Sequence, residues 1–438
     1  MNVIDGQAGL VNYSSLIFYS LTINNILNIV VLLILAGITI SLVFSKNGII
    51  AKAREAAEKT NQAIINEQAE LNTLYNYMEN MLNEIGGGNT PEEPEMPDGW
   101  DDTKVDAVES EDNVVVPVPK GYTASKVTGE NTVEDGFVIY EGEEPVTDKS
   151  DIETAQTTRN QFVWVPVANP SEMYGTDSTG KKWGKLYNFS STGITPLNWT
   201  EQDGVMSITD EKDPREPDVV TGSDGTEHDA DNTNLQQAGL DASATADTFK
   251  EQLETEFNSM IASVERYGGF YIGRYETGNL KETEAVVVKN NSDINNQNWY
   301  TMYNKSKGVA VNSNVTTSMI WGCQWDAVMR WMYNSGDEEK KTYTYDSTGK
   351  GNYDGTQGST NKVIPTGSNP AYEVNNIYDM AGNVLDWTIE AGDTSGRVTR
   401  GGNFYGSASR SPASVRSSLV PTNSDSDVPH GSRLALYM

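Results

Sequence analysis

Few residues in this sequence are of the types that carry out nucleophilic, redox or metal chemistry. Its 438 residues include one cysteine, Cys323, and two histidines, His228 and His430. A single cysteine excludes an internal disulfide and a zinc site built from several cysteines, and two histidines exclude a three-histidine metal centre. Cys323 lies in an apolar, helix-like stretch, so we interpret it as a small buried side chain. The available residue types favour binding over catalysis.

Charge excludes a further class of function. The sequence has 62 acidic and 31 basic residues, which gives a formal net charge of −31. A surface this acidic repels phosphate backbones, so we expect no nucleic-acid partner. Gly175, Gly180 and Lys181 have the spacing of a phosphate-binding loop, but Lys182 stands where serine or threonine would bind magnesium. We interpret that motif as a turn.

The segment Asn403–His430 is the richest in side chains that suit ligand contact. It contains no Lys, Glu, Gln, Met or Trp. Codons of the form AAC or AAT, randomised at their adenines, cannot encode any of these five types, so adenine-directed mutagenesis would leave this bias. An ordinary serine-rich surface loop is the alternative, and both stay open. The candidate ligand-binding residues are Asn403, Tyr405, Ser407, Ser409, Arg410, Val415, Arg416, Ser417, Asp425, Asp427 and His430.

Short β-like runs and two amphipathic helices must position these residues. Strand patterns occur at Val114–Tyr122, Gly136–Tyr140, Phe162–Val167 and Gly268–Glu276. Asp247 is the expected N-cap of one helix, whose apolar face is Leu253, Phe257, Met260, Ile261 and Val264. A second helix, Trp321–Tyr333, places Trp325, Val328, Met329 and Met332 inward. Because strands and helices do not alternate regularly, we predict an α+β domain over 114–438, with an irregular acidic excursion at about 168–246.

The chain before this domain has a different character. Gly6–Ser45 carries no formal charge, and its apolar part, Ile26–Phe44, would be about 28 Å long as a helix, which matches a bilayer core. We predict a membrane-spanning helix there rather than a secretory signal, since no basic region precedes it. An apolar stripe within 47–85 predicts a continuing helix that self-associates. The acidic stretch 86–113 is the expected disordered linker.

The N-terminal helix resembles that of type IV pilin-like proteins. The resemblance rests on LLILAGITI at Leu32–Ile40, followed by Ser45–Ile50 and Ala51–Thr60. The basic leader and the early glutamate of prepilins are missing around Ile26. Basic residues follow the apolar span and would favour a cytoplasmic domain by charge alone, whereas the resemblance implies an external one. We expect a single-pass membrane protein with its large domain outside the cell.

The large domain resembles the formylglycine-generating-enzyme (sulfatase-modifying factor) family, a variant of the C-type lectin fold. NIYDMAGNVLDWTIE at Asn376–Glu390 and RVTRGGNFYGSASR at Arg397–Arg410 carry the resemblance, together with GSRLALYM at the C-terminus. It covers about Val114–Met438 and implies a C-type lectin-like head. Family enzymes hold copper on two cysteines after the R-G-G motif, and here that region has none. We therefore expect no copper, iron or zinc and no enzymatic activity.

Two function classes compete with the expectation of a surface-displayed binding protein. One is a divergent formylglycine-type modifying enzyme, and the other is a minor structural pilin. A further resemblance favours the hypothesis of a binding protein. The chain resembles the targets of diversity-generating retroelements, which carry their variable residues near the C-terminus of a C-type lectin-like domain. The ligand would be a protein or a glycan.

The family resemblance also implies a structural calcium ion. In the family, the stretch corresponding to Asp379–Trp387 wraps the ion. The implied ligands are the side chains of Asp379 and Asp386 and the backbone carbonyls of Gly382 and Val384. Carboxylates and carbonyls from one tight loop suit calcium, although Asp386 is one methylene shorter than the glutamate usual in the family. Side chains that merely cap turns are the alternative.

Overall fold

The computed structural model describes thirteen stretches of the chain, all within the unit Glu93–Met438. They are residues 94–148, 152–177, 180–197, 199–202, 205–208, 219–220, 228–278, 286–292, 297–309, 312–353, 362–393, 396–423 and 429–438. The pilin-like helix, the apolar span Ile26–Phe44 and the self-association stripe within 47–85 lie outside the described residues.

The prediction of a single-pass membrane protein with an external domain is corrected here. Among the described residues, no helix combines the length and the apolar character that crossing a bilayer requires. The longest helix in this part of the chain, α5 (Ala246–Tyr267), has 22 residues but is amphipathic, with Lys250, Glu251 and Glu254 among its polar positions. Its apolar residues form one stripe that packs on the protein core rather than a surface that lipid could surround.

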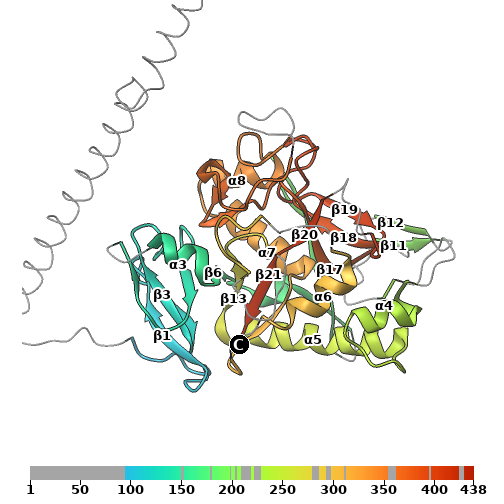
Figure 1. The fold of residues 1–438 in the computed structure, drawn as a ribbon, viewed down its shortest axis with the longest axis horizontal. Coiled ribbons are helices and arrows are strands. Elements are labelled where there is room, and N and C mark those ends of the chain that lie inside the picture. Colours follow the sequence, from blue (N-terminus) through green and yellow to red (C-terminus); the bar gives the residue numbers. More distant parts are fainter. Residues whose placement is uncertain are drawn as a thin grey trace, which may run out of the picture. The chain divides into compact units, whose positions relative to one another are not determined.

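A seven-stranded sheet forms the centre of the described fold (Figure 1). Its strands, in spatial order, are β14 (Thr316–Met319), β21 (Leu434–Tyr437), β13 (Gly269–Gly273), β6 (Gln161–Pro166), β4 (Val138–Glu141), β3 (Tyr122–Lys126) and β5 (Val146–Thr147). Neighbours run antiparallel except for the β3–β5 pair. The predicted strands at 136–140, 162–167 and 268–276 are confirmed. All five residues of β13 are buried, so this strand is covered on both faces.

Helices cover this sheet with the apolar faces that the sequence predicts. α5 contacts β13 and β21, and its five predicted core residues are all fully buried. The helix starts earlier than expected, because Thr245 rather than Asp247 is its N-cap and accepts a hydrogen bond from the Thr248 amide. α7 (Gly322–Tyr333) has Trp321 as its N-cap and buries Cys323. The remaining described helices are α3 (Ile152–Thr158), α4 (Asn232–Gln237), α6 (Trp299–Ser306) and α8 (Glu338–Tyr345).

A second, four-stranded sheet carries the C-terminal motifs. Its order is β19 (Arg416–Leu419), β18 (Gly396–Arg400), β17 (Leu385–Asp393) and β20 (His430–Ser432), and β17 pairs with β20 in parallel. A two-stranded ladder, β15 (Glu373–Val374) with β16 (Ile377–Tyr378), precedes it and follows the short helix η3 (Pro370–Tyr372). The α+β prediction is therefore confirmed for the described residues.

The predicted linker is wrong for residues 94–113. β1 (Val105–Glu109) pairs with β2 (Val115–Pro119), and Val105 is fully buried. The Trp100 ring meets Tyr267 of α5 edge-on, with ring centroids 5.9 Å apart. Acidic composition hid these apolar anchors, because carboxylates such as that of Asp106 point to solvent beside them.

The predicted irregular excursion at about 168–246 contains regular structure. Three antiparallel hairpins occur there: β7 (Tyr174–Asp177) with β8 (Gly180–Gly184), β9 (Leu186–Ser190) with β10 (Gly193–Leu197), and β11 (Trp199–Gln202) with β12 (Val205–Ile208). Short helices η1 (Pro170–Glu172) and η2 (His228–Ala230) flank them. Leu186 and Leu197 reach the core, and buried Asp229 forms a 2.7 Å ion pair with Arg397. Long-range contacts, rather than local periodicity, order this region.

Candidate ligand-binding surface

Two glycines after β18 direct the chain into the candidate surface. Gly401 and Gly402 have φ angles of 81° and 73°, which L side chains rarely adopt. A Cβ on Gly401 would lie 2.7 Å from the Met380 carbonyl oxygen, and one on Gly402 would lie 2.8 Å from that of Ser411. Backbone geometry thus requires both glycines of the R-G-G motif.

Buried residues hold the following loop in place. Phe404, Ala408 and Ala413 are buried. The Trp325 indole of α7 donates to the Ala413 carbonyl at 2.9 Å, and the Tyr353 hydroxyl bonds the carbonyls of Gly401 and Ser411 at 2.9 and 2.6 Å. The loop therefore rests on the domain core through side chains from other elements.

The residues between these anchors face solvent. Tyr405 is 60% exposed, the largest value among the exposed large apolar side chains of the described residues, and its ring contacts Phe404 with centroids 4.0 Å apart. Ser407, Ser409, Arg410 and Ser417 are exposed, and Asn403 and Val415 are half-buried. We call these residues the binding surface: Asn403, Tyr405, Ser407, Ser409, Arg410, Val415 and Ser417.

Arg416 does not join this surface, contrary to the prediction. Its side chain is 11% exposed and forms ion pairs with Asp326, at 3.0 Å, and with Glu390. Arg400 pairs with the same two carboxylates, so two cations and two anions form one buried network. Burial raises the pKa of Glu390, and the neighbouring guanidinium groups of Arg416 and Arg400 oppose that rise. Arg416 therefore links β19 to α7 and β17.

His430 is also buried rather than part of the binding surface. It lies in β20, is fully buried and stacks on Trp387, with centroids 5.1 Å apart and planes 13° apart. The prediction that His430 contacts a ligand is wrong for this arrangement, because β17 pairs with β20 and encloses the ring. Asp425 and Asp427 lie outside the described residues.

The four predicted calcium ligands lie in one buried turn-and-strand segment. Asp379 has a φ of 57°, and its Oδ2 accepts hydrogen bonds from Thr366 Oγ1 and the Gly367 amide at 2.9 and 2.8 Å. Gly382 also has a left-handed φ, and Val384 and Asp386 are buried. Oδ1 of Asp379 and Oδ1 of Asp386 are buried without a hydrogen-bond partner.

Glu276, which the sequence reasoning missed, belongs to the same buried region. Its Oε2 accepts from Asn383 Nδ2 at 2.6 Å, and its Oε1 accepts from the Val384 amide at 3.3 Å. A glutamate three residues after the buried strand β13 was the available signal, because a carboxylate so close to the core needs partners. Arg433 is the nearby cation, with Nε 3.6 Å from Asp386 Oδ2.

Burial and mutual repulsion disfavour the charged forms of the carboxyl groups in this region. Burial raises the pKa of Asp386 to about 7, and it also raises the pKa values of Asp379 and Glu276. Two orphaned carboxylate oxygens beside a single guanidinium are compatible with a bound cation. Within the described ranges, no group of three or more acidic, histidine or cysteine side chains is arranged to hold a metal. Calcium on Asp379 and Asp386 with backbone carbonyls stays a prediction.

Comparison with known proteins identifies one segment of the chain. Residues 322–436 match the model of the sulfatase-modifying factor enzyme 1-like domain, which confirms the predicted resemblance for these residues. No curated protein sequence matches the chain.

Solved structures show weak similarities. CarF is 15% identical over 39% of this chain and 87% of its own, with a TM-score of 0.30. Treponema denticola variable protein 1 is 16% identical over 64% and 96%, with a TM-score of 0.23. The U1 variant of the Major Tropism Determinant is 13% identical over 76% and 81%, with a TM-score of 0.27. At these TM-scores, none of the three similarities supports an inference about this chain.

Proposed function

We propose that the domain containing the sulfatase-modifying-factor-like segment is a non-enzymatic, C-type lectin-like scaffold whose binding surface contacts a protein or a glycan. One observation carries the proposal: Tyr405 stands 60% exposed on a loop that the core holds in place. An exposed tyrosine offers a partner a large contact area that is apolar on the ring and polar at the hydroxyl. A fixed loop also loses little conformational entropy when it binds.

The composition of the binding surface supports this proposal. Tyrosine and arginine often dominate interface energies, and Tyr405 and Arg410 are both exposed. Small serine side chains around them, such as Ser407 and Ser409, supply adaptable hydrogen bonds. The arrangement suits broad contact with a partner rather than enclosure of a reacting group.

The competing enzyme hypothesis lacks its reactive groups. The sequence from Gln324 to Met438 contains no cysteine, although the resembled oxidases use two after the R-G-G motif. Soft thiolate ligands are what copper(I) selects. Cys323 is buried on α7. The chemistry that defines the resembled enzymes therefore has no ligand set in this sequence.

Diversification of the binding surface by adenine-directed mutagenesis is the second part of the proposal. Buried Phe404, Ala408 and Ala413 alternate with solvent-facing positions in the loop. Such an arrangement tolerates changes on its outer positions without loss of the fold. A reverse transcriptase gene beside a near-copy of the coding sequence, with differences confined to adenines, would support this part. Neighbouring DNA without either feature would contradict it.

Binding is tested with arrays of immobilised proteins and glycans probed with the full chain. Replacing both Tyr405 and Arg410 by alanine should abolish whichever specific signal the unmodified chain gives. The matched control replaces Val114 and Arg266, an exposed apolar residue and an exposed arginine away from this loop, and should keep the signal. Equal binding by both variants would contradict the assignment of the binding surface.

A further inference from the structure

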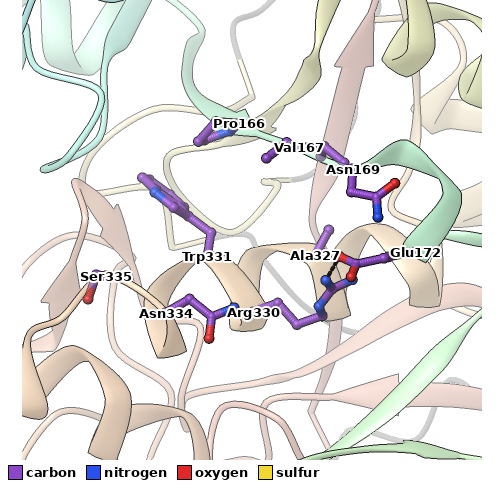
Figure 2. A pocket seen from close by; sticks show the side chains of 10 residues that line it. Pro166, Val167, Asn169, Glu172, Ala327, Arg330, Trp331, Asn334 and Ser335 are labelled. Atoms are coloured by element: carbon purple, nitrogen blue, oxygen red, sulfur yellow. Dashed lines mark ion pairs between the residues drawn. The ribbon is translucent and has the colours of Figure 1, made fainter.

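A cavity of about 280 Å³ lies between the end of β6 and α7 (Figure 2). It shares no residue with the binding surface, so the inference drawn from it does not depend on the proposed function. The lining residues come from two segments: 166–169 with Glu172 on one side, and Ala327, Arg330, Trp331, Asn334 and Ser335 on the other. Its volume lies just below the usual range of ligand pockets, about 300–1,000 Å³, so the occupant is closer in size to one ring than to a chain.

Apolar groups form one side of this cavity. Figure 2 shows the Trp331 indole lying toward Pro166 and Val167. Trp331 packs partly on the hydrophobic core and is half-buried, so part of the indole is open to an occupant. A partly exposed indole next to a proline ring offers flat apolar contact area to a ligand that has a flat apolar face.

Polar groups form the other side, and their charges cancel. Glu172 and Arg330 form an ion pair across the cavity. The Arg330 guanidinium also lies over the Tyr187 ring, 4.8 Å from its centroid. Asn169, Asn334 and Ser335 add neutral polar side chains. A full positive or negative charge on the ligand would have to compete with this pair, whereas a neutral polar ligand would not.

Hydrogen bonds hold the backbone that carries part of the polar side. The Tyr187 hydroxyl donates to the Glu172 carbonyl at 2.8 Å, and the Lys185 ammonium donates to the Ser171 carbonyl at 3.1 Å. Both bonds hold η1 against the β9 region, and α7 is a packed helix. Because this backbone is held in place, binding would cost little rearrangement of the main chain.

We propose that this cavity binds a neutral pyranose sugar ring. The C–H face of such a ring would lie on the Trp331 indole, and its hydroxyl groups would bond to the side chains of Asn169, Asn334 and the Glu172–Arg330 pair. Amide, carboxylate and guanidinium groups supply both donors and acceptors, which a ring bearing several hydroxyls requires. A ligand without hydroxyls would cover the amide groups of Asn169 and Asn334 without replacing their hydrogen bonds to water.

The test is saturation-transfer NMR and tryptophan fluorescence on the full chain with methyl glucoside, methyl galactoside, methyl mannoside and N-acetylglucosamine. At least one of these pyranosides should bind saturably, and choline and benzoate should neither bind there nor displace it. Trp331→Ala should weaken binding by about tenfold or more, and Trp331→Phe should retain most of it. Tyr405→Ala, on the separate binding surface, should bind the sugar like the unmodified chain.

A blocking variant keeps the proposal testable if Trp331→Ala does not fold. Ala168 lines the cavity but is exposed, so Ala168→Phe fills the cavity without disturbing the core and should abolish sugar binding. Absence of saturable binding by every pyranoside would overturn the proposal. Binding that survives both Ala168→Phe and Trp331→Ala, or displacement of the sugar by choline or benzoate, would also overturn it.

Discussion

Replacing Arg416 by alanine separates a structural role for this residue from the ligand contact that its sequence position suggests. In the folded domain Arg416 faces Asp326 and Glu390, both fully buried, and Arg400 is the other cation of the group. Removing Arg416 leaves two carboxylates with one guanidinium inside the protein. Breaking a buried pair in this way costs about 3–5 kcal/mol of unfolding free energy.

The loss should depend on pH in a defined direction. Burial already raises the pKa of Glu390, and removing a cation raises it further. A carboxyl whose folded pKa is raised contributes stability below its unfolded pKa and loses that contribution as the pH rises through the folded value. The destabilisation caused by Arg416→Ala should therefore be larger at pH 8 than at pH 5, because a raised pKa favours protonation of Glu390 at the lower pH.

Denaturant unfolding of the full chain at both pH values measures this effect. Arg410→Ala is the matched control, since Arg410 is exposed on the same loop and should change stability by about 0.5 kcal/mol or less. Adding Glu390→Gln to Arg416→Ala removes the uncompensated charge and should recover part of the loss at pH 8. A loss below about 1 kcal/mol for Arg416→Ala, or one that is the same at both pH values, would refute the buried-network account.

Three other outcomes follow from the same structure. If calcium binds at Asp379 and Asp386, chelation should lower the melting temperature more at pH 8 than at pH 5.5. Burial raises the pKa of Asp386 to about 7, so protons compete with the cation at the lower pH. A melting temperature that chelation leaves unchanged at both pH values would exclude the site. Purified chain should neither retain stoichiometric copper(I) nor convert a cysteine-containing CxPxR peptide to formylglycine, and turnover above background would revive the enzyme hypothesis. Gly402→Ala should destabilise the domain by clearly more than Gly99→Ala. Both glycines have left-handed φ values, but only a Cβ at position 402 would meet a carbonyl oxygen, that of Ser411 at 2.8 Å. Equal unfolding midpoints would show that the loop can move aside.

Local pattern predicted the elements whose apolar residues repeat regularly. The strand at Phe162–Val167 and the helix at Trp321–Tyr333 were predicted because continuous or amphipathic apolar runs have few alternatives in a folded domain. The stretch 94–113 was predicted to be a disordered linker because its average composition is strongly acidic. That average conceals two apolar anchors, Trp100 and Val105. The two anchors, together with the β1–β2 pairing, order this acidic segment.

The candidate site shows where reasoning from sequence stops. Arg416 stands in a run of serines that is typical of an exposed loop, and its partner Asp326 is 90 positions away in the chain. Glu276 meets Asn383 at a separation of 107 positions. Pairings at this range depend on how α7 and the two sheets pack, and no local motif encodes them. By contrast, the two adjacent glycines at 401 and 402 are a local signal, because both adopt the positive φ angles that glycine tolerates.

Two predicted contact residues, Arg416 and His430, are largely buried, so the diversification hypothesis predicts which positions vary and which do not. Adenine-directed mutation would be tolerated where side chains face solvent. It would disrupt the fold at Arg416, which belongs to the buried ion network, and at His430, which stacks on Trp387. Copies of this coding segment within one population should therefore differ at Tyr405, Ser407 and Ser409, while Arg416 and His430 stay the same. Sequencing many copies measures the two classes directly. Variation at Arg416 and His430 as frequent as at Tyr405 would mean that the segment is not diversified on this fold, because most of the resulting chains would lose the contacts that hold β19 and β20 in place.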